Sequence, residues 1–589
     1  MSDPVFGIAI RRIDEDPRPV IGADLSTIGI IGPCDSADDD TFPLNDPVFL
    51  NSNSLQTLAL LGEDGLIPDA IRGINDQLGE TQFAARIVMV RTAYGTDADP
   101  TIAMQQTIAN VVGNSLTGTG IFAFLRSAHK LGFTPRIIIA PGYTSQMATG
   151  VGNITQVEDG VGYSMDHRYE ITFSSGGSDA VQATGHAFGL PDGSLGPVLL
   201  DMPGAWYSSD PTVTAPAPYK EVSAAAVHSG AIGSGYAVND TIRLPNDVEL
   251  EVDTVDGSGG ITAVTVLESG NTPYPDETAD NPILPISTTG TGTGASFDLT
   301  WVDAGTTATY TAVTSVGANP FCASITSVLN QVYGHAIVES SGASMQNDTD
   351  WRETMQSQRI IPISGGCRVL DPVSSFVVFR PLAPRIAGIL VRRDHEKGAP
   401  FHSAANQPIQ GIIGPMRDIG FSLTDNANEG QELLGFNIGI VVRGEVGDDF
   451  AIASGGFVFI GTDNAGEDEL WRFYNVMRGR DYIHLGLIKS LRFFLGRYNI
   501  TGHTIMAILQ TMKYFLRDLY ADGHILGYKV VFRVESNSAE KIRLGHLAVG
   551  FKAEEPPPLR LIIIESQRYR DAIDAMVADV AAQLNLSTS

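Results

Sequence analysis

Apolar and polar residues near the N-terminus follow a pattern that predicts a mostly parallel sheet. Short apolar runs at residues 27–32 and 47–50 predict strands, and residues 67–78 carry apolar side chains at the spacing of one helical face. A further apolar run at residues 86–92 is typical of a buried strand. Strand, helix and strand in this order predict a βαβ unit.

A second unit of this kind is predicted, but its parts lie far apart in the chain. Residues 136–140 predict a buried strand, whereas the matching helix and strand are predicted at 321–332 and 335–338. The intervening residues 145–318 are rich in Gly, Ser, Thr and Pro and contain 21 acidic residues against three basic ones. An acidic all-β insertion that projects into solvent is the simplest interpretation.

Alternating segments within the insertion predict a β-hairpin. Residues 248–255 and 261–266 alternate apolar with polar side chains, and an Asp-Gly turn pair lies between them. The glycines of GTGTGA (290–295) imitate part of a dinucleotide-binding fingerprint, but no parallel strand and helix flank them. We therefore expect a glycine-rich β-turn at this point.

Helices and strands alternate again over residues 371–552, which predicts a C-terminal α+β domain. The expected helices are 384–392, 479–496 and 503–520, and the expected strands are 528–534 and 546–552.

Both ends of the chain are predicted to be extended arms. Residues 1–20 alternate apolar and charged positions and then reach two prolines. In the second arm, 553–589, three prolines stiffen the lead into a predicted strand at 559–565 that has no hairpin partner nearby. A strand of this kind is suited to adding to a sheet of another subunit. The candidate residues for this contact are Leu561, Ile562, Ile563 and Ile564.

A helix predicted at 568–585 follows this strand and carries an apolar stripe. The stripe suits either a core contact or docking against an adjacent subunit.

Length and charge limit the classes of protein that the chain can be. Its 589 residues are too many for one hydrophobic core and predict about three or four domains. A net charge of −29 disfavours direct contact with nucleic acid or anionic membrane. The start of the sequence lacks a secretory apolar core, and no run approaches the roughly 18 apolar residues of a membrane span. We therefore expect a cytosolic product without membrane insertion.

Motifs for catalysis or cofactor binding are scarce. The sequence contains no GxxxxGK[ST] phosphate loop, HExxH zinc helix or GxSxG nucleophile elbow. One compact polar cluster matches no metal-site spacing, so we expect a solvated turn after a helix there. Its members are Asp394, His395, Glu396 and His402. We expect no enzymatic activity, cofactor or metal.

Three cysteines are too few and too scattered for a zinc site. Cys34, Cys322 and Cys367 are either buried free thiols or, because their number is odd, candidates for a disulfide between subunits.

Several stretches match one family's motifs in the family's order. FPLNDPVFLNS (42–52), LGEDGLIPDAIRGINDQ (61–77), RIVMVR (86–91) and RIIIAPG (136–142) are similar to its N-terminal block. Three later stretches are PLAPRIAGILVRRDHEKGAPFHSAANQPIQGIIG (381–414), LWRFYNVMRGRDYI (470–483) and FLRDLYADGHILGYKV (515–530). In these respects the chain resembles the contractile tail sheath family of phage tails, R-type pyocins and related injection machines. It departs from the family where Ser403 to Asn406 replace Pro-Ala-Asn and where Gly461-Thr462 lacks a following arginine.

The resemblance implies a structural subunit that forms stacked hexameric rings around a tail tube and contracts to drive the tube through the host envelope. Implied partners are further copies of the chain, the tube protein, and baseplate and neck proteins. The implied location is the virion tail, after assembly in the bacterial cytoplasm. An α/β sheath domain would comprise 21–144 and 319–370, and residues near 230–302 resemble a small β module of phage structural proteins.

The C-terminal domain would face the tube. Candidate contacts to an acidic tube are Lys489, Arg492, Lys513 and Arg517, with ordinary helix surface as the alternative. Two other functions stay open: a sheath of a non-phage contractile device, and a receptor-binding or enzymatic tail component, for which no convincing carboxylate pair is visible.

Overall fold

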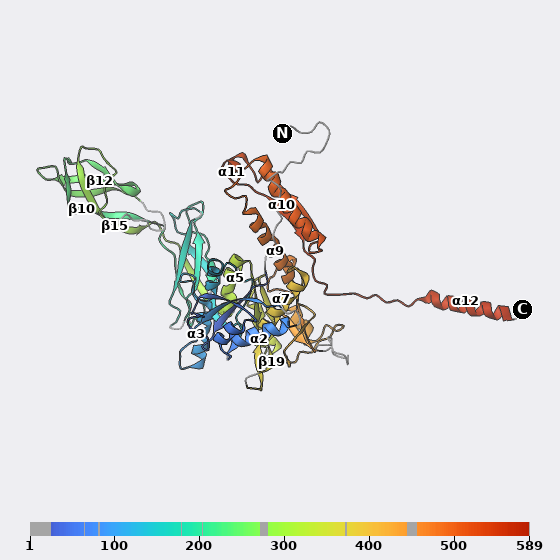
Figure 1. The fold of residues 1–589 in the computed structure, drawn as a ribbon. Helices are drawn as coiled ribbons and strands as arrows, with labels where there is room; N and C mark the ends of the chain where they lie inside the picture. The colour runs from blue at the N-terminus through green and yellow to red at the C-terminus, as the bar shows by residue number, and fades with distance from the viewer. Residues whose placement is uncertain are drawn as a thin grey trace, which may run out of the picture.

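A computed structural model describes residues 25–587 except 64, 80–82, 166, 178–179, 203, 271–280, 318, 372–373 and 444–455. The predicted N-terminal arm, residues 1–20, lies outside the described residues. Figure 1 shows a central body, a β-rich branch, a helical branch and a C-terminal segment that leads away from the body.

A six-stranded sheet forms the centre of the body, with the order β18-β17-β4-β1-β3-β2. Its strands are β1 (Ile28–Pro33), β2 (Pro47–Asn51), β3 (Arg86–Thr92), β4 (Ile137–Ile139), β17 (His335–Glu339) and β18 (Ile360–Ile363). All neighbours pair in parallel except β2 with β3. Because β17 pairs with β4, the two halves of the second βαβ unit meet across the long insertion.

Helices cover both faces of this sheet. They are α1 (Leu55–Leu61), α2 (Leu66–Leu78), α3 (Pro100–Val112), η1 (Gly120–Arg126), α4 (Ser127–Leu131), α5 (Pro320–Val332), α6 (Met345–Glu353) and α7 (Ala383–Lys397). Alternate strand residues enter two apolar clusters: Ile30 packs with α2 and α7, whereas Ile31 packs with α3 and α5. The first cluster extends to Tyr474, so the predicted domain border at residue 370 falls inside one core.

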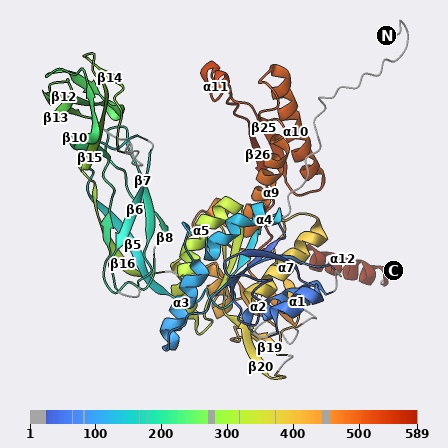
Figure 2. The same ribbon diagram turned by 60° about the vertical axis from the view of Figure 1, so that its left-hand side comes forward.

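The insertion forms the β-rich branch in Figures 1 and 2. The sheet nearer the body, in the order β5-β16-β9-β6-β7-β8, contains β5 (Ala148–Glu158), β6 (Arg168–Ser174), β7 (Thr184–Phe188), β8 (Leu199–Met202), β9 (Thr212–Thr214) and β16 (Thr309–Gly317). Farther out lie β10 (Tyr219–Ser234), β11 (Thr241–Arg243), η2 (Pro245–Asp247), β12 (Val248–Val255), β13 (Ile261–Ser269), β14 (Ser287–Thr288) and β15 (Thr293–Ala304). Each part has its own apolar cluster.

The remaining elements lie in the body and in the helical branch. Two small sheets belong to the body: β19 (Gly366–Leu370), β20 (Val377–Pro381) and β22 (Gly414–Pro415), and β21 (Gln407–Ile409), β23 (Ile440–Val442) and β24 (Phe457–Ile460). Short helices there are α8 (Glu429–Gly435) and η3 (Glu469–Trp471). The branch contains α9 (Tyr474–Leu491), α10 (Gly502–Ala521), α11 (Ala539–Arg543), β25 (Gly527–Val531) and β26 (Gly550–Glu554).

Several predicted bounds in this part differ from the structure. Helix α9 begins at Tyr474, five positions before the predicted start at 479, and α11 was not predicted. Helix α7 continues to Lys397 because its last polar residues stay helical until Gly398, whose φ of 75° ends the helix. The predicted arm start at 553 falls inside β26, which ends at Glu554.

The C-terminal segment is extended and then helical. Residues 555–569 have no regular secondary structure, so the predicted strand at 559–565 is not formed in the single chain. A strand needs a neighbour for its hydrogen bonds, and no strand in the described part of the chain pairs with this segment. Helix α12 (Arg570–Ser587) follows and lies away from the body (Figure 1).

Candidate functional site

Charged residues from different sequence motifs form buried ion pairs inside the body. Asp69 of α2 lies 3.5 Å from the Arg385 guanidinium of α7, and both side chains are buried. The Arg385 Nη1 also donates to the Pro381 carbonyl at 3.0 Å. At Gly388 an added Cβ would lie 2.9 Å from the Gln77 side chain, so α2 and α7 cross closely. These contacts lock α7 onto the first helix.

Asp394 corrects the prediction of a solvated turn. It lies within α7, is buried, and its carboxylate accepts hydrogen bonds from both terminal nitrogens of Arg478 in α9, one of them at 3.1 Å. Its neighbour His395 stacks on Phe83 with ring centroids 4.1 Å apart. Of the cluster, only Asp394 is buried: His395 and Glu396 lie exposed in the last turn of α7, which continues to Lys397, and His402 lies beyond the helix. The pair joins the body to the helical branch.

A second buried ion pair reinforces the same junction. Asp481 of α9 accepts from both terminal nitrogens of Arg359, one at 3.1 Å. His335 of β17 lies 4.0 Å from Asp481. Burial, together with the positive charges of Arg359 and Arg478, holds the pKa of His335 well below its usual value. The imidazole is therefore neutral within this ionic cluster.

Glu339 binds the backbone of the Ala-Pro-Gly motif at Gly142. Its buried carboxylate accepts hydrogen bonds from the backbone N–H groups of Gly142, Leu382 and Ala383 at 2.7–3.0 Å. Burial raises its pKa, and the three hydrogen bonds oppose that rise. The loop after β4 and the first turn of α7 are thereby tied to β17.

Two ion pairs fix the root of the C-terminal arm to the body. Arg480 contacts the Glu555 carboxylate at 2.7 and 2.8 Å, and Glu555 is buried. Arg560 donates to both oxygens of Asp463, at 3.0 and 3.2 Å, and lies over the Phe473 ring at 5.8 Å. The free part of the arm therefore begins after Arg560.

Beyond Arg560 the arm exposes apolar side chains to solvent. The four predicted contact residues are 69–84% exposed: Leu561, Ile562, Ile563 and Ile564. Exposed apolar runs of this kind mark interaction sites in soluble proteins.

The four predicted tube-contact residues lie on the helical branch. Lys489 and Arg492 are at the end of α9, Lys513 and Arg517 are on α10, and all four are exposed. Arg517 pairs with its neighbour Asp518 at 2.9 Å. The whole branch shares this charge, because residues 482–554 contain ten Lys and Arg against five Asp and Glu. The structure brings the four onto one branch, and their partner stays a prediction.

The three cysteines are free and buried. Burial raises the pKa of the Cys367 thiol to about 12 and raises that of Cys322 as well, so neither forms the reactive thiolate readily. No route to a thiol of another chain is open in this conformation. A disulfide between subunits stays a prediction that this burial disfavours.

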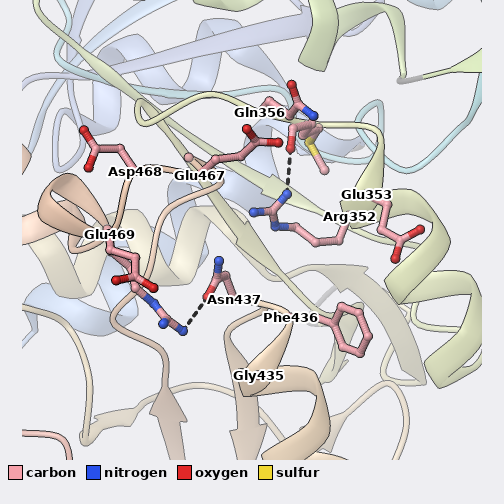
Figure 3. Close-up of a pocket in the computed structure, with 12 residues that line it drawn as sticks. Arg352, Glu353, Gln356, Gly435, Phe436, Asn437, Glu467, Asp468 and Glu469 are labelled. Atoms are coloured by element: carbon pink, nitrogen blue, oxygen red, sulfur yellow. Dashed lines mark hydrogen bonds between the residues drawn. The ribbon is translucent and has the colours of Figure 1, made fainter.

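One hollow of the body holds none of the predicted residues. It has a volume of about 530 Å³ and lies between the end of α6, α8 and the loop before η3. Figure 3 shows Arg352 and the acidic residues Glu353, Glu467 and Glu469 around it. Among the described residues, no group of three or more His, Cys, Asp or Glu is placed to hold a metal ion. Nor does any helix in this part of the chain have the length and apolarity to cross a membrane.

Sequence reasoning missed the buried ionic contacts. The signal that could have found them is their place in the motifs that carry the family resemblance. The residues concerned are Asp69, Arg385, Asp394 and Arg478. Their pairing joins residues more than 80 positions apart, which no local pattern reveals.

Comparisons with known proteins identify relatives of one kind. No protein-family model matches the sequence. The tail sheath protein of Escherichia phage P2 is 28% identical over 167 residues, which is 28% of this chain and 41% of the relative. The major tail sheath protein of Serratia phage KSP20 is 30% identical over 152 residues, 25% of this chain and 37% of the relative. The matches thus span less than half of these relatives.

A solved structure is similar over a longer range but more distantly. It is the sheath complex of an extracellular contractile injection system, PVC, in the contracted state. The match covers 97% of this chain and 99% of the solved chain, with 9% sequence identity and a TM-score of 0.47. The resemblance to contractile tail sheath proteins, stated from the sequence motifs, is confirmed by the named relatives.

Proposed function

We propose that this chain is a structural subunit of a contractile tail sheath, and that it acts without catalysis. Copies polymerise as stacked hexameric rings around a tail tube and contract to drive the tube through the host envelope. The observation that carries this proposal is the C-terminal arm, which is anchored at Arg560 and exposes an apolar strand sequence that pairs with no strand among the described residues. Phage relatives named as tail sheath proteins support it.

Strand addition supplies the link between subunits. The sheet of β25 and β26 has two strands among the described residues, and a two-stranded sheet is marginally stable alone and leaves two edges open. The arms of neighbouring copies, residues 1–20 and the segment after Arg560, add to such edges. Backbone hydrogen bonds then give affinity, while the proline-stiffened lead allows the subunits to reorient without separating.

The buried ion pairs at the junction favour movement of each subunit as a rigid body. Asp394 with Arg478 and Asp481 with Arg359 hold α9 firmly to the body, since breaking such a pair leaves an uncompensated buried charge. The contraction step therefore relies on the arms and not on bending within the subunit.

The inner and outer sides of the assembly differ in charge. The basic helical branch faces an acidic tube through exposed, salt-sensitive contacts that break on firing. The insertion carries 21 of the acidic residues and points outward, away from the tube. Baseplate and neck proteins bind the ends of the stack, and the assembled product lies in the virion tail.

The alternative is a sheath of a non-phage contractile device, which would use the same residues. Negative-stain electron microscopy of the purified full chain tests the proposal. Long hollow tubes of the expressed protein support a sheath. Discrete small oligomers at every concentration contradict it and favour a receptor-binding component.

A further inference from the structure

A β-hairpin on the body, formed by β19 and β20, has apolar side chains on one face that stay exposed among the described residues. In β19 and β20, Cys367, Val369 and Val378 pack toward the core. The opposite face and the hairpin end carry Leu370, Phe376, Val377 and Phe379, which are 56–73% exposed. An antiparallel sheet normally presents polar residues on its solvent side, so this face lacks a covering layer.

Helix α12 also carries apolar side chains that are exposed to solvent. Its apolar stripe recurs at helical spacing, and each member is 49–73% exposed: Tyr569 in the lead, then Ile573, Met576, Val577, Val580 and Leu584. Within the described part of the chain, both the helical stripe and the hairpin face are therefore exposed. Strand β20 is also an edge strand, which makes an uncovered apolar face a hazard for aggregation.

We propose that α12 of one copy docks on the β19–β20 face of a second copy. The sizes agree: the helical stripe from Ile573 to Leu584 spans about 17 Å at 1.5 Å per residue, and a five-residue strand also spans about 17 Å. Each exposed side chain offers on the order of 100 Å², so ten of them bury roughly 1,000 Å², the lower limit of a specific interface. This contact is separate from strand addition and does not depend on contraction.

The chemistry of α12 argues against other occupants. The helix carries Asp571, Asp574 and Asp579 against Arg570 alone, so an anionic membrane repels it. Two α12 helices side by side would also repel each other. Arg368 lies on the hairpin face opposite Phe379, and its guanidinium is already paired with Asp418 at 3.1 Å, so the docking contact is apolar and not ionic. In the described chain both apolar faces stay exposed although they share one polypeptide. Helix α12 leads away from the body (Figure 1), so the arrangement points to a second copy.

Cross-linking between two singly substituted full-length chains tests the contact. Val577→Cys chains are mixed with Phe379→Cys chains, oxidised mildly and run on a non-reducing gel. The three native cysteines are buried and stay silent. A disulfide requires Cα atoms within about 7 Å, so the band reports direct contact. The matched control is Ala582→Cys, on the opposite side of α12.

We expect the Val577→Cys mixture to give about tenfold more cross-linked dimer than the Ala582→Cys mixture, and Val577→Asp, but not Ala582→Asp, to weaken association. Equal yields overturn the proposal. A dimer from Val577→Cys chains alone shows helix pairing instead, and a cross-link confined to one chain carrying both substitutions shows an intramolecular contact; either result also overturns it. Polymerisation through the strand segment is measured separately by microscopy, so failure here leaves the proposed function standing.

Discussion

Single residues at the junction of body and branch carry the largest expected effects on stability. Replacing Asp394 by Ala leaves Arg478 charged and buried without its partner. We expect a loss of about 3–5 kcal/mol, because an uncompensated buried charge is costly. Thermal unfolding followed by circular dichroism measures it as a lower midpoint. Asp518→Ala is the matched control: its pair with Arg517 is exposed, and we expect no measurable change in the unfolding midpoint. Similar losses for the two variants would contradict the structural assignment.

Acid should weaken the fold through His335. Its pKa in the folded chain is far below its usual value, so the folded imidazole stays neutral while the unfolded one gains a proton below about pH 6.5. Because the unfolded state then binds more protons, stability falls as pH falls, by up to about 1.4 kcal/mol per pH unit. The effect of Glu339 has the opposite sign. Because its pKa is raised in the folded chain, the stability that it contributes is lost as pH rises above the pKa of the unfolded carboxyl.

The comparison with His335→Leu isolates the His335 contribution, since Glu339 is common to both chains. Unfolding midpoints are measured near pH 7 and near pH 5.5. We expect the midpoint of the parent chain to drop more than that of the variant. Parallel drops would show that His335 does not cause the acid sensitivity.

At the scale of elements, the crossing of α2 and α7 is the tightest test of packing. A side chain at Gly388 would meet the Gln77 side chain and the Ile74 carbonyl within about 3 Å. We expect Gly388→Leu to cost about 1–3 kcal/mol, because overpacking forces the two helices apart. Gly420→Leu is the control, since no atom lies within 4 Å of a Cβ at that position. Urea unfolding that shows no difference between the two would refute the close crossing.

Periodic patterns predicted the elements whose packing is local. Strand β3 was predicted at the bounds it has, and α5 differs by one residue, because apolar spacing records the buried face directly. Helix α7 was placed in a C-terminal domain, yet it packs on α2, more than 300 positions away. No local pattern encodes that contact. The ionic partner of Asp394 was hidden for the same reason, and the predicted arm strand has no regular secondary structure in the single chain.

The whole molecule separates its charges, which leads to a prediction about tube contact. The helical branch is basic and the insertion strongly acidic within one chain of net charge −29. We expect Lys513→Glu with Arg517→Glu to abolish co-assembly with purified tube and to leave polymerisation without tube intact, because the contact is electrostatic. Arg168→Glu with Arg243→Glu, both exposed on the insertion, is the control for net charge. Co-sedimentation measures binding, and unchanged binding by the first pair would contradict the assignment.

The most direct test of the account removes the free arm and keeps its root. A chain ending at Arg560 retains β26, Glu555 and the Arg560 contact with Asp463, so the body should fold as before. Sedimentation velocity of this chain and the full chain, at equal concentration, compares their assembly. The account predicts long polymers for the full chain and monomer for the truncated one. Polymers of the same length from both would contradict it.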